Sequence, residues 1–158
     1  MSDHRRKFLV VADQSEECRT ALYFAAKRAQ ATDCGLVLLA VIEPSNFDHW
    51  IGVSETMRRE AEEDATELLD TLAEDAEAVM GERPDLVLRE DEKREALAKL
   101  IEEDDHISIL VLGAAEAGEG PGPLVTALAR GRGLTGARAI PVTVVPGGLS
   151  RDEIDQLT

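Results

Sequence analysis

The fold of this chain is predicted most directly from residues 7–42, which read KFLVVADQSEECRTALYFAAKRAQATDCGLVLLAVI. The segment opens with a short apolar run at 7–12, whose β-branched valines are typical of a buried strand. Residues 15–35 then place alanine and leucine at helical spacing, and a second continuous apolar run occupies 36–42. We therefore expect a buried strand, a helix packed on it, and a second buried strand parallel to the first.

The ends of this first helix have candidate capping residues. Asp13 or Ser15 could cap its N-terminus, and Asp13 and Glu16 have the spacing of a capping box. Gly35 is the expected stop, because glycine readily adopts the left-handed conformation that ends many helices. An aspartate at the end of a strand can cap the helix and line a site at the same time, and we expect Asp13 to do both.

The rest of the chain repeats this alternation. Helices are predicted at 54–80, 93–105 and 124–130, and strands at 84–90, 107–114 and 140–146. Strand 84–90 is short and polar, as suits the edge of a sheet. Ser150 and Glu153 could cap a small tail helix. The pattern predicts one α/β domain over 1–149, with three layers around a five-stranded parallel sheet, followed by a C-terminal tail at 150–158.

The longest predicted helix, 54–80, has an apolar stripe that runs from Met57 to Met80 and an opposite face rich in glutamate and aspartate. We expect the stripe to pack on the sheet. The acidic face is expected to be solvated, with some i,i+4 pairs to Arg58 and Arg59.

A binding site is expected at the carboxyl ends of the strands, where the strand order of an open parallel sheet reverses. If the order is 3-2-1-4-5, strands 7–12 and 107–114 are neighbours at that point. Asp13 follows the first of them, and the glycine-rich segment GAAEAGEGPGPLVTALA, 113–129, follows the second. We expect both to line one crevice, with the connection at 43–50 close by.

Four segments carry a resemblance to a known family. They are KFLVVADQSEECRTALYFAAKRA, GLVLLAVIEP, ISILVLGA and IPVTVVP. In order and character they resemble the universal stress protein family, and the resemblance covers nearly the whole chain. It implies the strand order 3-2-1-4-5 of the Rossmann-like, adenine nucleotide alpha-hydrolase-like fold. It also implies a cytoplasmic stress-response role and a homodimer joined through the last strand, at Val142, Thr143, Val144 and Val145.

One subgroup of that family binds ATP through a motif after the fourth strand. The motif is a glycine, two residues, a glycine, nine residues, and a glycine followed by serine or threonine. Gly113 matches the first glycine, but Glu116 stands in place of the second, and Thr126 and Ala127 stand in place of the final pair. The phosphate half of the motif is therefore degenerate. The resemblance also places Asp13 beside the base and ribose, and the backbone of Val41 opposite the adenine. The candidate nucleotide-binding residues are Ala12, Asp13, Val41, Gly113, Gly118, Gly120, Gly122 and Thr126.

Physical chemistry indicates what this degeneracy costs. Pro121 and Pro123 have no N–H to offer a phosphate, and Glu116 and Glu119 add charge of the wrong sign. A carboxylate ~6 Å from a phosphate charge costs about 3 kcal/mol at an effective dielectric constant of ~20. The attraction between a phosphate charge and a helix N-terminus contributes only about 0.3–2 kcal/mol. The loop glycines still allow close approach. The expected cofactor is therefore ATP or AMP, with the adenosine part favoured, and Mg²⁺ is expected only together with a nucleotide.

Composition excludes several partner classes. The 158 residues carry a formal net charge of −15, which repels nucleic acid and anionic lipid. No apolar run reaches the ~20 residues that span a bilayer, and the N-terminal segment lacks a long apolar region, so we expect a cytoplasmic protein. Cys18 and Cys34 form no motif; two reduced thiols are expected, with a disulfide as the alternative.

Other candidate sites are weaker. Arg130, Arg132 and Arg138 precede the last strand, so we expect a solvated loop at the amino edge of the sheet, away from the crevice. The three histidines have no metal-ligand spacing, so no metal site is expected. The chain has no nucleophile elbow and no Walker lysine, so no catalytic residue is predicted. Three functions stay open: a stress-response module that senses a ligand, a scaffold for an unknown protein partner, and a weak ATP hydrolase.

Overall fold

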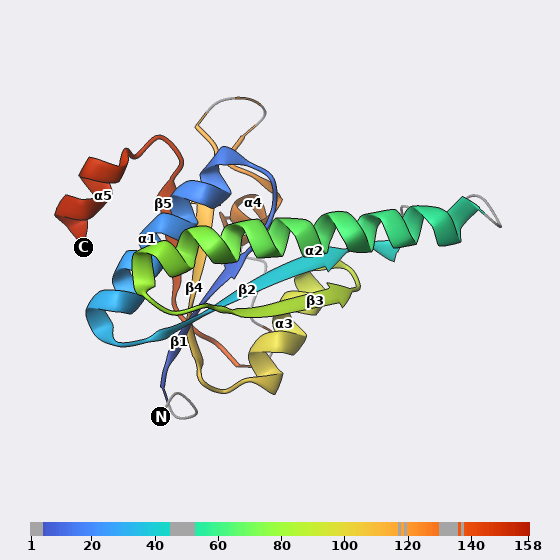
Figure 1. Cartoon of the computed structure of the whole chain (residues 1–158), viewed down its shortest axis with the longest axis horizontal. Helices are drawn as coiled ribbons and strands as arrows, with labels where there is room; N and C mark the ends of the chain where they lie inside the picture. The colour runs from blue at the N-terminus through green and yellow to red at the C-terminus, as the bar shows by residue number, and fades with distance from the viewer. Residues whose placement is uncertain (1–4, 45–52, 117, 119, 130–135, 137) are drawn as a thin grey trace.

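The computed structural model describes residues 5–44, 53–116, 118, 120–129, 136 and 138–158, and its helices and strands alternate as predicted (Figure 1). The elements are β1 (Lys7–Val11), α1 (Glu16–Thr32), β2 (Gly35–Ile42), α2 (Val53–Met80), β3 (Asp85–Glu90), α3 (Lys93–Glu103), β4 (Ile107–Ala114), α4 (Pro123–Ala129), β5 (Val142–Pro146) and α5 (Arg151–Leu157). None of the helices in the described part of the chain has the length and apolarity that crossing a bilayer requires.

The sheet confirms the predicted order. Its five strands are arranged β3-β2-β1-β4-β5, and every neighbouring pair is parallel. β3 and β5 are therefore the edges, and β1 and β4 lie side by side at the centre. The strand order reverses between these two strands, so their carboxyl ends form the expected switch point.

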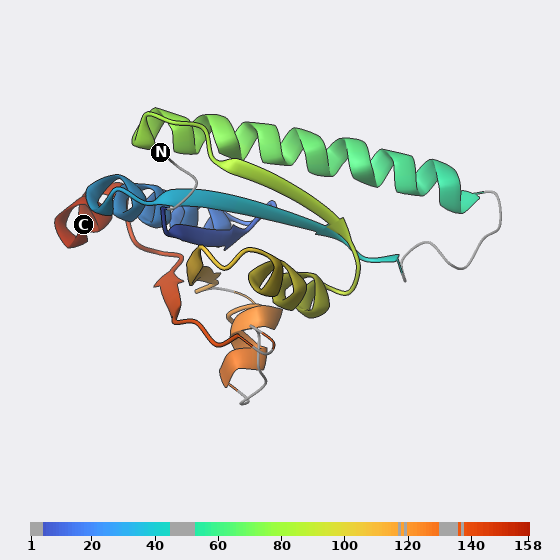
Figure 2. The same cartoon turned by 90° about the horizontal axis from the view of Figure 1, so that it is seen from below.

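Two apolar layers hold the helices on the faces of the sheet. Phe8 and Val10 of β1 belong to the core shared with α1 and α2, whereas Leu9 and Val11 belong to the core shared with α3 and α4. Figure 2 shows α2 on one side of the sheet and α3 and α4 on the other. Since β1 is buried on both faces, its apolar run is continuous rather than alternating. Each fully buried aliphatic side chain contributes about 1.5–3 kcal/mol to this arrangement.

The two ends of α1 differ from the expectation. Ser15 is the N-cap, and its hydroxyl accepts a hydrogen bond from the Cys18 N–H at 3.1 Å. Asp13 does not cap the helix; its carboxylate instead accepts the Ser15 N–H at 2.8 Å. The helix ends at Asp33, whose φ of 55° is left-handed, a conformation that aspartate tolerates. Gly35 does not end the helix, because it already pairs with Lys7 as the first residue of β2.

α2 packs on the core of the sheet from Ala65 onward. Burial begins at Leu69 and continues through Leu72 to Met80, whereas Met57, predicted to face inward, is 38% exposed. Figures 1 and 2 show why: the first turns of the helix run past the ends of β2 and β3. Arg58 pairs across to Glu90 of β3, with 2.7 Å between Nε and Oε1.

The tail helix α5 packs on α1 of the same chain. Ile154 is 1% exposed, and the Tyr23 hydroxyl donates a hydrogen bond to Asp155 at 2.7 Å. The guanidinium of Arg151 lies 4.6 Å from the centre of the Tyr23 ring. The capping box of Ser150 and Glu153 is present as predicted.

Arg138 is not part of a solvated loop, and that expectation was wrong for this residue. Its guanidinium donates to the carbonyl oxygens of Ile101 and Asp104 at 3.0 Å and of Ile107 at 2.6 Å. The last carbonyls of a helix have no partner within it, so the carbonyls at the end of α3 are available to the Arg138 guanidinium. The three bonds connect the C-terminal end of α3 to the start of β4, at the amino edge of the sheet. Arg130 and Arg132 lie outside the described residues.

Candidate functional site

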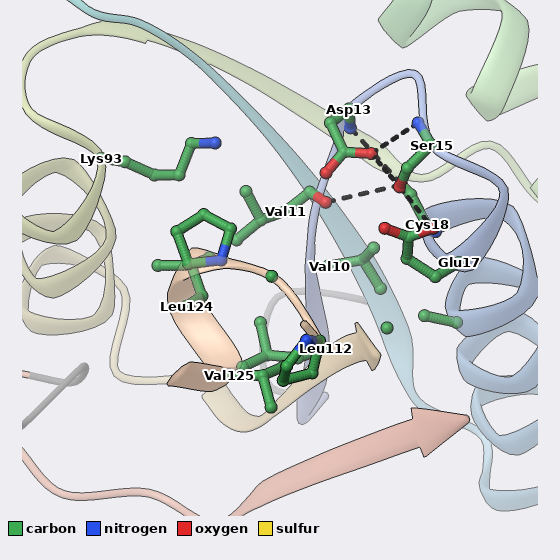
Figure 3. A pocket seen from close by; sticks show the side chains of 15 residues that line it. Val10, Val11, Asp13, Ser15, Glu17, Cys18, Lys93, Leu112, Leu124 and Val125 are labelled. Carbon is green, nitrogen blue, oxygen red and sulfur yellow. Dashed lines mark hydrogen bonds between the residues drawn. The ribbon is translucent and has the colours of Figure 1, made fainter. Parts of the chain in front are cut away.

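A crevice lies at the carboxyl ends of β1 and β4, at the predicted switch point (Figure 3). Its walls come from five places: the end of β1, the first turns of α1, the first residue of α3, the end of β4, and the turn that leads into α4. Its volume is about 80 Å³, smaller than the ~300–1,000 Å³ of typical ligand pockets. Only part of a nucleotide-sized ligand would therefore fit within the crevice as it stands.

Three of the eight predicted site residues line the crevice, and five do not. The lining residues are Asp13, Gly113 and Gly122, and the others are Ala12, Val41, Gly118, Gly120 and Thr126. Ala12 is buried in the core, with its N–H bound to the Leu39 carbonyl at 2.7 Å. Val41 packs against the core on the α3 side of the sheet. Thr126 lies within α4, and its N–H bonds to the Gly122 carbonyl at 2.9 Å.

Asp13 is held in place by the residue that caps α1. Its Oδ1 accepts hydrogen bonds from both the N–H and the hydroxyl of Ser15, and its own N–H lies 3.4 Å from the Cys18 Sγ. Oδ2 has no hydrogen-bond partner among the residues that the structure describes. Asp13 can therefore accept a hydrogen bond from a ligand hydroxyl without giving up the bonds that orient it.

Gly113 brings the two sides of the crevice together. A methyl group at this position would overlap the backbone carbonyl of Glu17, so a side chain cannot be accommodated there. The same close packing continues at Gly147, where an added methyl would lie 2.9 Å from the Ala114 oxygen and from the Glu17 Cβ. The first turn of α1 can therefore rest directly on β4 because these positions are glycine.

Glu116 does not face the crevice. Its carboxylate lies against Gly148 in the turn after β5, where an added methyl group would collide with it. The repulsion expected from Glu116 therefore does not act inside the crevice, and Glu119 lies outside the described residues. The acidic charge there comes instead from Asp13 and from Glu17, in the first turn of α1, and the sequence analysis did not single out Glu17. Its position four residues after Asp13 was the available signal.

The turn before α4 gives the crevice an apolar wall. Pro121 and Pro123 line it together with Leu112, Leu124 and Val125. Pro123 is the first residue of α4, a position where the missing N–H of proline costs nothing. The turn holds glycines with positive φ, from 99° to 114° at 118, 120 and 122. These two prolines supply no N–H donors, as the sequence predicted.

The crevice is also lined by Cys18 and Lys93. Burial raises the pKa of the Cys18 thiol to about 11, so this cysteine is a protonated, unreactive group at neutral pH. Cys18 and Cys34 are both free. Lys93, the first residue of α3, lines the crevice on the side opposite the first turn of α1 (Figure 3). It lies far from Asp13 in the sequence, and no motif marked it.

One small acidic cluster lies away from the crevice. Asp104, Asp105 and His106 bring ligand atoms within 4.8 Å of one another, at the amino end of β4. Asp104 is already bound to the Lys7 ammonium at 2.9 Å. Burial alone would raise the pKa of Asp104, but the hydrogen bond from Lys7 holds it below its usual range. The cluster is therefore explained by this ion pair, and His4 and His49 lie outside the described residues.

The comparison with protein families now identifies the chain. The model of the universal stress protein family matches residues 4–130. The chain belongs to this family. A comparison with curated protein sequences gives no significant match.

Solved universal stress proteins share the fold at low sequence identity. UspA from Lactobacillus plantarum has a TM-score of 0.70 and 13% identity, with 90% of this chain and 98% of that chain covered. The Arabidopsis thaliana family protein with AMP bound has a TM-score of 0.61 and 12% identity, with 89% and 91% covered. The Archaeoglobus fulgidus protein in complex with dAMP has a TM-score of 0.61 and 15% identity, with 90% and 98% covered. At these identities the similarity establishes the fold of this universal stress protein.

Proposed function

We propose that this universal stress protein is a cytoplasmic stress-response module that binds an adenine nucleotide in the crevice between β1 and β4. The observation that carries the proposal is Asp13, whose carboxylate is oriented by Ser15 and whose Oδ2, unbonded within the described part of the chain, can accept a ligand hydroxyl. A ribose offers such hydroxyls. The relatives with bound AMP and dAMP support the choice of nucleotide class.

AMP is the favoured ligand over ATP. The turn before α4 carries Pro121 and Pro123 where backbone donors would face a phosphate chain, and Asp13 and Glu17 make the α1 side of the crevice acidic. Each added phosphate charge is therefore repelled by groups that do not repel the nucleoside. Mg²⁺ would enter only with a polyphosphate, whose charge it would screen.

The test is thermal unfolding with and without millimolar AMP, adenosine and Mg-ATP. A nucleotide at 100 times its Kd adds ~2.7 kcal/mol, which raises Tm by roughly 5–10 °C for a chain of this length. Asp13→Asn should abolish most of the shift, whereas Asp64→Asn, exposed on α2, should preserve it. No shift with any of the three ligands would refute the proposal.

One observation favours a second function, a scaffold without a small ligand. The crevice holds only about 80 Å³, and two prolines stiffen its wall. In that case the turn before α4 would be a rigid recognition surface for a protein partner. Absence of any ligand-induced shift, with a fully folded protein, is the result that this function predicts.

We also propose a homodimer joined along β5. This strand pairs with β4 on one side only, and Val144 on it is 38% exposed. An unpaired edge with an exposed valine is a template for pairing with a second copy. Sedimentation should give a dimer at tens of micromolar, a rough working range for weak interfaces. Val144→Lys should give a monomer, and a monomer in the unchanged protein would refute the proposal.

A further inference from the structure

We propose that the ammonium group of Lys93 binds the anionic group of the ligand in the crevice, and so selects a nucleoside monophosphate over the free nucleoside. This inference rests on the proposed function, because it assigns a role within that nucleotide site. Lys93 lines the crevice together with Asp13 and Glu17, which lie on the other wall. Figure 3 shows its side chain extending from α3 toward the middle of the crevice.

Lys93 occupies a position where a cation is electrostatically unfavourable. It is the first residue of α3, and the N-terminal end of a helix carries partial positive charge. The neighbouring Glu92 offsets part of this positive charge, because its carboxylate caps the helix and accepts hydrogen bonds from the N–H groups of Arg94 and Glu95 at 3.2 and 3.1 Å. The described contacts of the Glu92 carboxylate are therefore with the helix backbone and with Arg94, and not with the Lys93 ammonium.

The Lys93 ammonium forms no ion pair with a carboxylate in the part of the chain that the structure describes. Lys99 on the same helix differs, because it pairs with Asp91 at 2.8 Å. Lys93 is half-buried, and its ammonium is directed into the crevice and is unpaired among the described residues. It is therefore available to form a charge-assisted hydrogen bond with an anionic group of a ligand.

The α4 side of the crevice offers fewer backbone donors to an anion than an uninterrupted turn would. Pro121 and Pro123 offer no N–H donors, and the N–H of Ala115 is already bound to the Pro121 carbonyl at 3.2 Å. One lysine faces two carboxylates, Asp13 and Glu17, across the crevice. A ligand that fits this charge pattern has hydroxyl donors at one end and a single anionic group at the other, as AMP does.

The test is calorimetric titration with AMP and with adenosine. The proteins are the unchanged chain, Lys93→Gln, Lys93→Arg and Lys99→Gln. The last variant removes the same charge from the same helix, but from a residue outside the crevice. Lys93→Gln should weaken AMP by about 10-fold to 100-fold, as expected for one charge-assisted hydrogen bond, and adenosine by less than about 2-fold. Lys93→Arg should retain most of the AMP affinity, and Lys99→Gln should match the unchanged protein.

Two outcomes overturn the assignment and leave nucleotide binding intact. In one, Lys93→Gln and Lys99→Gln weaken AMP equally, so that only net charge matters. In the other, Lys93→Gln weakens AMP and adenosine by the same factor, so that the lysine acts on the nucleoside part. If neither AMP nor adenosine binds the unchanged protein, the assignment and the proposed function fail together. The Tm of each variant without ligand reports whether folding is preserved.

Discussion

Replacing Gly113 with alanine should strongly destabilise the fold, because the added methyl has no space. In the structure it would lie 2.6 Å from the backbone carbonyl carbon of Glu17 and would overlap the carbonyl oxygen. Both neighbours are backbone: Gly113 belongs to β4, which pairs with β1 and β5, and Glu17 belongs to the first turn of α1. Relief therefore requires α1 to move away from the sheet.

The magnitude follows from the cost of overpacking. An extra methylene in a well-packed core costs typically about 1–3 kcal/mol, and a clash between two backbone segments belongs at the upper end. We expect a loss of about 3 kcal/mol in the free energy of unfolding. For a chain of this length that corresponds to a Tm lower by roughly 6–12 °C.

Gly35→Ala is the matched control. An alanine there would lie 3.4 Å from the Lys7 Cγ, an ordinary contact, and Gly35 also lies in a central strand. The control should leave stability unchanged or raise it by about 0.5 kcal/mol, since alanine loses less entropy than glycine in a strand. Urea unfolding followed by circular dichroism measures both variants. A Gly113→Ala protein within about 0.5 kcal/mol of the control, the usual range for surface substitutions, would refute the close packing of α1 on β4.

Four further predictions test individual contacts. Ser15→Ala should cost about 1 kcal/mol through the lost cap, measured by urea unfolding, and should also weaken nucleotide binding by releasing Asp13; an effect on binding without one on stability would contradict the role of the cap. Arg138→Met should cost roughly 2–4 kcal/mol in the same assay, because three carbonyls lose a charged donor; unchanged stability would show that water replaces it. Because the pKa of Asp104 is depressed, its ion pair with Lys7 stabilises the fold fully above about pH 4, and this contribution is lost as the pH falls further. Lys7→Met should therefore make the free energy of unfolding depend less steeply on pH at acid pH. An unchanged pH dependence would contradict this. Cys18 should react with a thiol reagent only as fast as the protein unfolds, because burial raises its pKa to about 11, and rapid labelling of the native protein would contradict its burial.

The sheet was predictable from sequence because its signal is local and repeated. Apolar runs such as 36–42 are continuous, which already indicates burial on both faces, and each is separated from the next by a helical pattern. The polar character of the strand at 84–90 likewise placed it at an edge. The strand order itself came from the resemblance to the family, since patterning alone does not distinguish the permitted orders.

The site was less predictable because side-chain direction depends on tertiary packing. Glu116 was expected to oppose a phosphate, yet its carboxylate lies on Gly148, a residue that no local pattern connects with it. Lys93 enters the crevice from α3, and it could be found only once β1 and the start of α3 were placed in space. The choice between Asp13 and Ser15 as cap was open for a different reason: both have suitable side chains, and only the backbone path decides which one reaches the helix N–H groups.

The overhang of α2 gives one continuous helix two different stabilities. Its C-terminal turns are anchored by Leu69, Leu72 and Met80, with Ala65 and Leu68 packed against the same core, whereas no residue from Glu55 to Asp64 belongs to that core. Isolated helical segments of this length are marginal in water, so the free turns persist mainly as a continuation of the anchored ones. Amide hydrogens should therefore exchange along this helix in a gradient, fast near Glu55 and slow beyond Leu69, and a protease should cut first within the projecting turns.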